Sequence, residues 1–133
     1  MKRLIVDVDE TISQKGEDGY TNARLLIAMR DRLKEYKAMG FTIVLCSSRN
    51  MQTFESNVGR INAVTLPILV DWLDRNDVPY DEIYMGKPWC GNEGFYIDDK
   101  AVRPIEFVTR SYDELRRLLE DAAAEYMAHE DGA

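Results

Sequence analysis

Short apolar runs alternate along the chain with longer stretches of helical periodicity. Leu4–Val8 and Phe41–Cys46 are mostly apolar and β-branched, which is typical of strands buried inside a sheet. Shorter stretches at 81–85 and 94–97 predict two further strands. Strands separated by helices favour a parallel sheet, because parallel neighbours need a crossover connection that is usually helical. We therefore expect an α/β fold of the Rossmann-like kind, with a parallel sheet of about four to five strands flanked by helices.

Three longer stretches carry apolar residues at three- and four-residue spacing and predict helices. The first is Asn22–Met39, with Leu25, Met29 and Leu33 among its apolar positions. The second covers 65–75, where Thr65 can serve as the N-cap and a proline falls in the first turn. The third is Ser111–Met127, whose serine and the glutamate three residues later predict a capping box.

The remaining segments are polar or mixed. Residues 12–20 contain Gly16 and Gly19 and predict a loop or a small flap, while residues 48–62 are long enough for another helix. The tail at 128–133 is expected to fray. No repeat, low-complexity tract or linker divides the chain, so we expect a single domain over residues 1–133.

The composition disfavours several classes of binding partner and of functional site. The 133 residues carry 17 basic and 24 acidic side chains, and the net charge of −7 disfavours nucleic acid or an anionic membrane as the main partner. No apolar run approaches the ~20 residues of a membrane span, and the run after Met1 is too short for a signal peptide. Two cysteines and one histidine, His129, disfavour a disulfide scaffold, a zinc site and a Ser-His-Asp triad. Free thiols fit a cytoplasmic protein.

Polar side chains with a shared chemistry follow the predicted strands. An Asp-x-Asp-x-Thr pattern, a serine, a lysine and an acid pair come at successive strand ends, which gather at one edge of a parallel sheet. Carboxylates without histidines favour Mg²⁺ as a cofactor. One carboxylate can attack phosphorus while a second acts as acid and base, and a hydroxyl and an ammonium can bind the phosphoryl oxygens. The pattern therefore indicates phosphoryl transfer. Its residues are Asp7, Asp9, Thr11, Ser47, Lys87, Asp98 and Asp99.

With these four elements in this order, the sequence resembles the haloacid dehalogenase (HAD) superfamily of Mg²⁺-dependent phosphatases. The resemblance implies that Asp7 is the nucleophile and a metal ligand. It implies that Asp9 is the general acid and base and binds the metal through its backbone carbonyl. Asp98 would be the third metal ligand. The supporting roles implied are phosphoryl binding by Ser47 and Lys87, bracing of the first loop by Thr11, and support of the metal shell by Asp99.

The stretches at 48–51, 86–91 and 96–104 resemble, more narrowly, small phosphatases of capsular polysaccharide biosynthesis. This implies a sugar phosphate as substrate. The intervals 12–46 and 48–86 leave no room for the cap domain that many members carry, so the site is expected to be open unless a second copy in a homo-oligomer covers it. Four side chains flank the central residues and are candidates for substrate contact: Arg49, Trp89, Lys100 and Arg103.

The sequence departs from the family pattern at three places. Glu10 stands where many members have glycine, Ser47 replaces the commoner threonine, and the interval from Lys87 to Asp98 is too short for the usual helix.

Three other interpretations stay open. A nucleotide or a nucleic-acid end phosphate is the alternative substrate. A signalling receiver domain also forms an aspartyl-phosphate, but its acid pair lies at the first strand, whereas here the pair comes last. A HAD-fold binding module without activity is the third, and measured turnover separates it from an enzyme.

Overall fold

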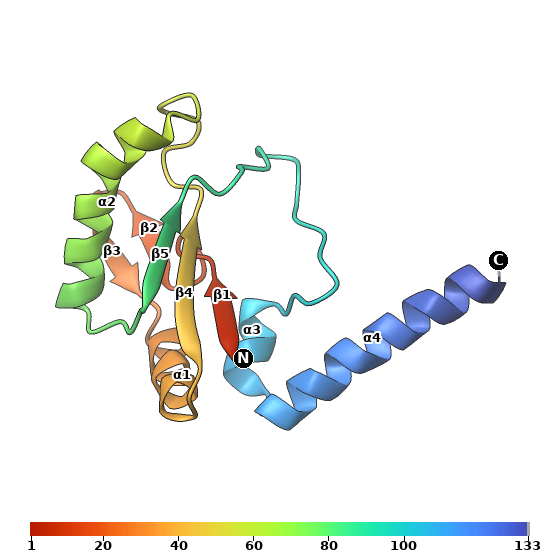
Figure 1. Cartoon of the computed structure of the whole chain (residues 1–133). Coiled ribbons are helices and arrows are strands. Elements are labelled where there is room, and N and C mark those ends of the chain that lie inside the picture. Colours follow the sequence, from red (N-terminus) through yellow and green to blue (C-terminus); the bar gives the residue numbers. More distant parts are fainter. Residues whose placement is uncertain (133) are drawn as a thin grey trace. The chain divides into compact units, whose positions relative to one another are not determined.

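The structure is a computed structural model that describes residues 1–132. Within these residues the chain falls into two compact units, unit 1 (Met1–Trp89) and unit 2, which begins at Cys90. Unit 1 contains β1 (Arg3–Val6), β2 (Ser13–Gly16), β3 (Gly19–Leu25), α1 (Ile27–Ala38), β4 (Thr42–Ser47), α2 (Val58–Arg75) and β5 (Glu82–Met85) (Figure 1). Unit 2 contains α3 (Pro104–Thr109) and α4 (Tyr112–Gly132).

The central feature of unit 1 is a parallel sheet in the order β1-β4-β5. Its register pairs Val6 with Leu45 and Ser47 with Met85, so the three strands end at one edge. Helix α1 packs against β4, and α2 packs against β5. This confirms the predicted α/β class. Only a hairpin and α1 separate β1 from β4, and one helix separates β4 from β5, which leaves no cap domain at these positions.

The parallel sheet has three strands in the described residues, not the four to five that we predicted. Residues 94–97 form no strand, and Phe95 and Ile97 are 77% and 90% exposed. An apolar run becomes a strand only when a neighbouring strand satisfies its backbone groups. The expectation that Leu4–Val8 forms a strand buried inside the sheet was also wrong. Strand β1 pairs with β4 along one side, and Ile5 is 61% exposed.

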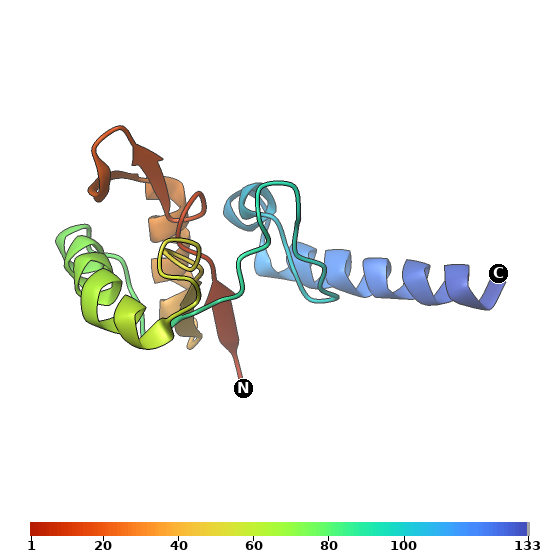
Figure 2. The ribbon, with the colours of Figure 1, turned by 90° about the horizontal axis from the view of Figure 1, so that it is seen from above.

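Residues 12–20 form most of a second, antiparallel sheet. Strands β2 and β3 make a hairpin that stands apart from the parallel sheet (Figure 2), with Gly19 in the left-handed region at φ 77°. The predicted helix Asn22–Met39 is therefore shorter, because residues 22–25 belong to β3. Two side chains of α2 hold this strand: Trp72 Nε1 donates to the Ala23 carbonyl at 2.9 Å, and Arg75 donates to the Thr21 carbonyl at 2.7 Å. In residues 22–25, these hydrogen bonds from α2 therefore favour a strand more strongly than the apolar spacing of the sequence favours a helix.

Helix α2 is longer than predicted. It begins at Val58 rather than at Thr65, and the side chain of its N-cap, Asn57, accepts from the Arg60 N–H at 3.0 Å. Thr65 is buried in mid-helix, where its hydroxyl donates to Asn50 Oδ1 at 2.8 Å. Pro67 lies inside the helix. Burial of an apolar stripe outweighs the hydrogen bond that the proline cannot make; that stripe is Ile61, Leu69, Trp72 and Leu73.

Unit 2 is mainly helical. The capping box of α4 is present: Glu114 N–H donates to Ser111 Oγ at 3.2 Å, and Ser111 N–H donates to Glu114 Oε1 at 3.1 Å. The hydrogen bond that the Glu114 carboxyl accepts from the Ser111 N–H is the main cause that holds the pKa of this carboxyl below its usual value. Helix α4 continues to Gly132, beyond the predicted end at Met127, and residue 133 of the expected tail lies outside the described residues. Helix α3 was not predicted.

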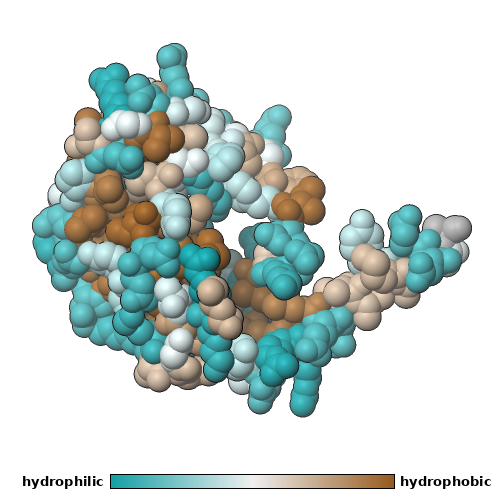
Figure 3. Space-filling model, in the orientation of Figure 1, coloured by the Kyte–Doolittle hydropathy of each residue, from teal (hydrophilic) through white to brown (hydrophobic). Residues whose placement is uncertain are grey.

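The exposed apolar surface is distributed over several elements. Figure 3 shows apolar surface in the region of α2 and β5, where Val64, Ile68 and Tyr84 are among the exposed large apolar residues. In residues 1–132, no helix combines the length and the hydropathy that crossing a membrane would require.

Candidate active site

The turn after β1 positions the first two candidate carboxylates. The carbonyl of Val8 accepts hydrogen bonds from the N–H groups of Thr11, Ile12 and Ser13 at 3.1, 2.8 and 3.2 Å. Glu10 lies in the left-handed region at φ 64°, and its N–H donates to the Ser13 carbonyl at 2.7 Å. The tight turn therefore demands at Glu10 a backbone conformation that glycine adopts without strain.

The Asp7 carboxylate is contacted by two side chains, those of Thr11 and Lys87. Thr11 Oγ1 donates to Asp7 Oδ2 at 3.2 Å, which agrees with the bracing role implied for this threonine. Lys87 Nζ lies 3.4 Å from Asp7 Oδ1, so the short interval after Lys87 does not prevent its ammonium from reaching the carboxylate. Both side chains keep some exposure, with 36% of Asp7 and 21% of Lys87 accessible.

A backbone hydrogen bond joins the chain at the ends of β4 and β5. The Lys87 N–H donates to the Ser47 carbonyl at 3.1 Å. Ser47 is buried, and its Oγ accepts from the Arg49 N–H at 3.0 Å, which leaves the hydroxyl proton available for an acceptor. The structure thus brings together the residues that the sequence predicted for nucleophile and phosphoryl binding.

Asp9 faces a different partner. Arg49 Nη2 donates to Asp9 Oδ1 at 2.7 Å and Nε donates to Oδ2 at 3.2 Å, a two-point contact. Ser13 Oγ donates to Asp9 Oδ1 at 3.4 Å. The guanidinium is covered by the Tyr20 ring of β3, whose centroid lies 4.1 Å from Cζ, and the Arg49 side chain is only 1% exposed. Arg49, which the sequence offered as a candidate for substrate contact, binds the Asp9 carboxylate in this structure.

Arg49 also carries an unsatisfied donor. Its Nη1 is buried, and no partner for it occurs within residues 1–132. Sequence reasoning missed Ser13 and Tyr20, whose roles depend on the hairpin folding back over Arg49. The hairpin glycines were the only signal for it.

Cys46 lies on β4 directly before Ser47. Burial raises the pKa of its thiol, and the lowering effect of Lys87 and the raising effect of Asp7 are smaller. The thiol is therefore protonated at neutral pH and is a poor nucleophile.

Four of the predicted site residues lie in unit 2, where the structure describes local contacts: Asp98, Asp99, Lys100 and Arg103. The Lys100 N–H donates to Asp98 Oδ1 at 3.0 Å. This bond is the main cause that holds the pKa of the Asp98 carboxyl below its usual value, and a hydrogen bond from Asp99 adds to it. The Arg103 N–H donates to Glu106 Oε1 at 2.7 Å at the start of α3.

The donor chemistry fits Mg²⁺, although no metal cluster is preformed. In the part of the chain that the structure describes, no three His, Cys, Asp or Glu side chains are grouped to hold a metal ion. Mg²⁺ commonly keeps several waters and binds through one or two carboxylates. Asp7 offers a carboxylate and Asp9 a backbone carbonyl at the end of β1, and both are hard oxygen donors.

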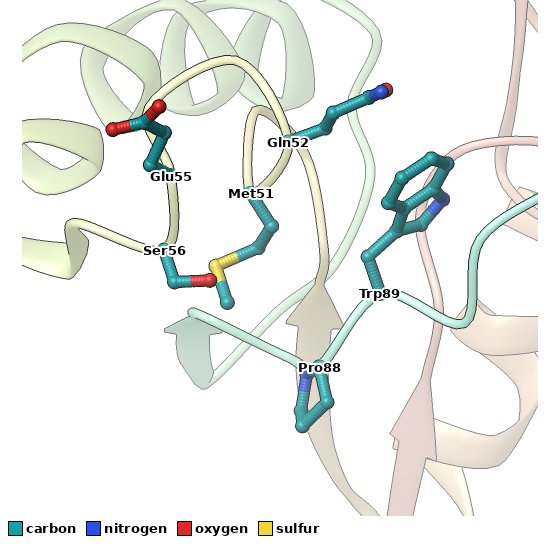
Figure 4. Close-up of a pocket in the computed structure, with 6 residues that line it drawn as sticks. All are labelled: Met51, Gln52, Glu55, Ser56, Pro88 and Trp89. Carbon is teal, nitrogen blue, oxygen red and sulfur yellow. The ribbon is translucent and has the colours of Figure 1, made fainter.

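A hollow of about 510 Å³ opens beside the ends of β4 and β5 (Figure 4). One wall is the loop after β4, and the other is the segment after β5. Sequence reasoning singled out only Trp89 of this lining. Its residues are Met51, Gln52, Glu55, Ser56, Pro88 and Trp89.

A search for similar structures found a close relative. The chain is similar to a target protein from Vibrio cholerae known from its crystal structure, with 51% sequence identity and a TM-score of 0.90. The match covers 92% of this chain and 99% of the Vibrio cholerae chain. No protein-family profile and no curated protein matches the sequence.

The weaker likenesses to solved structures have TM-scores below 0.5. One is the structure of the Pnkp1/Rnl/Hen1 RNA repair complex, at 21% identity and a TM-score of 0.47, covering 69% of this chain and 27% of that one. Another is D,D-heptose 1,7-bisphosphate phosphatase from B. bronchiseptica complexed with magnesium and phosphate, at 19% identity and a TM-score of 0.45. It covers 89% of this chain and 64% of that one.

Proposed function

This chain belongs to the same family as the Vibrio cholerae protein, and we propose that it is a Mg²⁺-dependent phosphomonoester hydrolase that acts through an aspartyl-phosphate. One observation carries the proposal. The Asp7 carboxylate at the end of β1 is held by Thr11 on one oxygen and approached by the Lys87 ammonium on the other. A partly exposed carboxylate beside a cation suits attack on a phosphoryl group.

In the first step, an Asp7 carboxylate oxygen bonds to phosphorus and the ester P–O bond breaks. The leaving oxygen takes a proton from the Asp9 carboxyl group, so the alcohol departs neutral. In the second step, water bonds to phosphorus, Asp9 takes a proton from that water, and the bond between phosphorus and Asp7 breaks. Inorganic phosphate leaves and both carboxyl groups return to their starting states.

The other residues would stabilise the charge on the phosphoryl group or hold the attacking carboxylate in position. The Lys87 ammonium and the Ser47 hydroxyl would bind oxygens of the transferring phosphoryl group and stabilise the charge that builds on them. Thr11 would keep the attacking carboxylate oriented through its bond to Oδ2. Asp7, the Asp9 carbonyl and Asp98 would hold Mg²⁺, which supplies positive charge that offsets repulsion between the carboxylate and the phosphate.

The substrate that we propose is a sugar phosphate. Support comes from the resemblance of three stretches to phosphatases of capsular polysaccharide biosynthesis, and from a site without a cap domain, which accepts a bulky leaving group. The nucleotide and nucleic-acid alternatives remain as outcomes of the substrate test.

The test is phosphate release from sugar phosphates, nucleotides and an aryl phosphate, with Mg²⁺ and with chelator. We expect release that requires the metal and disappears in Asp7→Asn, because a carboxamide is a far weaker nucleophile than a carboxylate. Asp121→Asn is the matched control, since Asp121 is exposed on α4, and it should keep wild-type turnover. Full turnover in Asp7→Asn would remove Asp7 as the nucleophile. Failure to hydrolyse any compound would favour a binding module.

Asp98 is tested separately, because the proposal requires it to act together with Asp7. Asp98→Asn should raise the Mg²⁺ concentration that gives half-maximal turnover by about tenfold or more, as expected for loss of a charged ligand. An unchanged Mg²⁺ requirement would remove Asp98 from the metal site while leaving the role of Asp7 intact.

A further inference from the structure

The hairpin of β2 and β3 contacts Asp9 directly and also contacts the arginine that binds Asp9. Ser13, the first residue of β2, donates from Oγ to Asp9 Oδ1 at 3.4 Å, and a backbone bridge pairs the two residues. Tyr20, on β3, covers the Arg49 guanidinium with its ring. A change in the hairpin can therefore alter the orientation of the Asp9 carboxylate.

The contact between the Tyr20 ring and Arg49 is short and shielded from water. The ring centroid lies 4.1 Å from Arg49 Cζ, and the Arg49 side chain is only 1% exposed. Attraction between a cation and an aromatic face is stronger when the cation is desolvated. Lys15 Nζ lies 4.6 Å from the same centroid, but Lys15 is exposed. The ring therefore binds Arg49 more strongly than it binds Lys15.

Hydrogen bonds hold only one edge of the guanidinium. Arg49 Nε and Nη2 both donate to Asp9, while Nη1 has no hydrogen-bond partner within residues 1–132. A planar group held at one edge can still tilt about that edge, and an aromatic face packed against the plane resists the tilt. Loss of the ring would therefore loosen the two-point contact with Asp9 without removing either of the bonded groups.

The contacts of Asp9 leave one of its oxygens available for proton transfer. Oδ1 accepts from Arg49 Nη2 and from Ser13 Oγ, whereas Oδ2 accepts from Arg49 Nε and from no other group in residues 1–132. A carboxylate oxygen has two lone pairs, so both positions of Oδ1 are used and one position of Oδ2 is open. Oδ2 is therefore the oxygen that can carry a proton, and Arg49 Nε sets its direction.

We propose that Tyr20 is a positioning residue of the phosphatase, which acts through Arg49 and directs Asp9 Oδ2 toward the leaving oxygen of the substrate. The inference rests on the proposed function, in which Asp9 protonates that oxygen. A basic leaving group such as phenolate needs this proton, whereas the weakly basic dinitrophenolate departs without it. Loss of the Tyr20 ring should therefore slow the hydrolysis of phenyl phosphate more than that of 2,4-dinitrophenyl phosphate.

The dependence on the leaving group provides the first test. The measurement is kcat/KM with Mg²⁺, because this quantity reports the steps up to departure of the leaving group. In Tyr20→Leu, kcat/KM should fall about tenfold for phenyl phosphate and less than about twofold for 2,4-dinitrophenyl phosphate. Tyr20→Phe keeps the ring and should keep the wild-type values. An equal fall for both compounds in Tyr20→Leu, or no fall for either, overturns the proposal.

Two control variants separate the contact with Arg49 from other effects of the substitution. Lys15→Met removes the other cation on the same ring, and Tyr126→Leu makes the same exchange at an exposed position of α4. Both should keep the wild-type kcat/KM for both phosphates. A fall in Lys15→Met as large as that in Tyr20→Leu would assign the effect to the hairpin as a whole and contradict the role of Tyr20.

The environment of Arg49 provides a second test, which needs no turnover. The NMR signal of the Arg49 Nε–H is identified by its absence in Arg49→Lys. It should move downfield in Tyr20→Leu, because protons over the face of an aromatic ring are shifted upfield, and it should keep its position in Lys15→Met. An unmoved signal in Tyr20→Leu would show that the ring does not control Arg49 and would overturn the proposal.

The two proposals fail in different ways. If the wild type hydrolyses both phosphates and Tyr20→Leu affects both equally, the role of Tyr20 is overturned and the phosphatase stands. If the wild type releases phosphate from no compound, the phosphatase is overturned, and the role of Tyr20 in proton transfer falls with it.

Discussion

The guanidinium of Arg49 binds both carboxylate oxygens of Asp9, with donor–acceptor distances of 2.7 and 3.2 Å. Asp9 comes from the turn after β1, and Arg49 from the loop after β4, so the contact joins two strand ends. Tyr20 of the hairpin lies over the guanidinium. The buried Arg49 guanidinium therefore holds the Asp9 carboxylate in one orientation, and the Tyr20 ring of the hairpin covers that guanidinium.

Substitution of Arg49 should affect the chemical step more than substrate binding. In Arg49→Lys the charge remains but the two-point contact is lost, and we expect kcat to fall about 10- to 100-fold with a smaller change in KM. Arg49→Ala should be at least as slow, and added guanidinium ion should restore part of its activity where urea does not.

Arg32→Lys is the control for this prediction, because Arg32 is paired with Glu35 away from these residues. Steady-state kinetics together with a melting temperature separates a positioning role from a folding defect. Wild-type kcat in Arg49→Lys would contradict a positioning role.

Gly86 determines how the chain leaves β5 and reaches Lys87. Its φ is 88°, and an added Cβ would lie 2.8 Å from Cγ2 of Val58. Gly86→Ala should lower the free energy of unfolding by about 1–2 kcal/mol and reduce turnover by displacing Lys87.

Gly16→Ala is the matched control, since an added Cβ there meets nothing within 4 Å and the φ of Gly16 is not positive. Chemical denaturation and kinetics measure the two effects. Adding Val58→Ala to Gly86→Ala should recover the part of the loss that comes from the close contact. An unaltered stability in Gly86→Ala would show that the turn tolerates a side chain.

Glu10 occupies a left-handed conformation in the turn between Asp9 and Thr11. Glu10→Gly should raise the free energy of unfolding by about 1 kcal/mol, because glycine adopts this conformation without a steric penalty. Glu10→Ala should bring no such gain. Glu17→Gly is the control, because Glu17 lies in the hairpin without a positive φ, and it should not raise the free energy of unfolding. Denaturant unfolding measures all three, and a loss of stability in Glu10→Gly would contradict the prediction.

Asp81, the residue before β5, should make the free energy of unfolding depend on pH. Its carboxylate accepts from Lys37 Nζ at 2.6 Å and from the Ile43 N–H at 2.8 Å, and in that order these bonds lower its pKa from the usual 3.8. A lowered folded-state pKa gives stability that is complete above the unfolded value and is lost as pH falls through the folded value. Wild-type stability should therefore fall on acidification below about pH 4.

Asp81→Ala should cost about 1–2 kcal/mol at pH 7, because the buried Ile43 N–H loses its partner. The difference from wild type should shrink at acidic pH. Lys37→Met removes only the exposed ion pair and should cost less. Urea unfolding across the pH range measures these values, and a pH-independent difference between Asp81→Ala and wild type would contradict the assignment.

The proximity of Asp7 and Lys87 was predictable because these residues follow the ends of strands in one parallel sheet. Asp7 and Ser47 come at or just after short apolar runs, and parallel strands bring their ends to one edge, so their proximity could be expected from order alone. The contact of Arg49 with Asp9 could not. It depends on side-chain direction and on a hairpin that carries Tyr20 over the guanidinium, and neither leaves a local pattern.

The sequence by itself determined the α/β class, the parallel pairing of three strands, the absence of a cap between them and the capping box of the last helix. These features depend on local periodicity, on residue types at element ends and on connection lengths. The tertiary structure decided that residues 22–25 pair as a strand, that α2 runs from Val58 through Pro67, and that residues 94–97 form no strand. In each case the deciding energy comes from non-local partners, since hydrogen bonds from α2 hold β3 and burial holds α2 together. A strand forms only where another strand is present to pair with it.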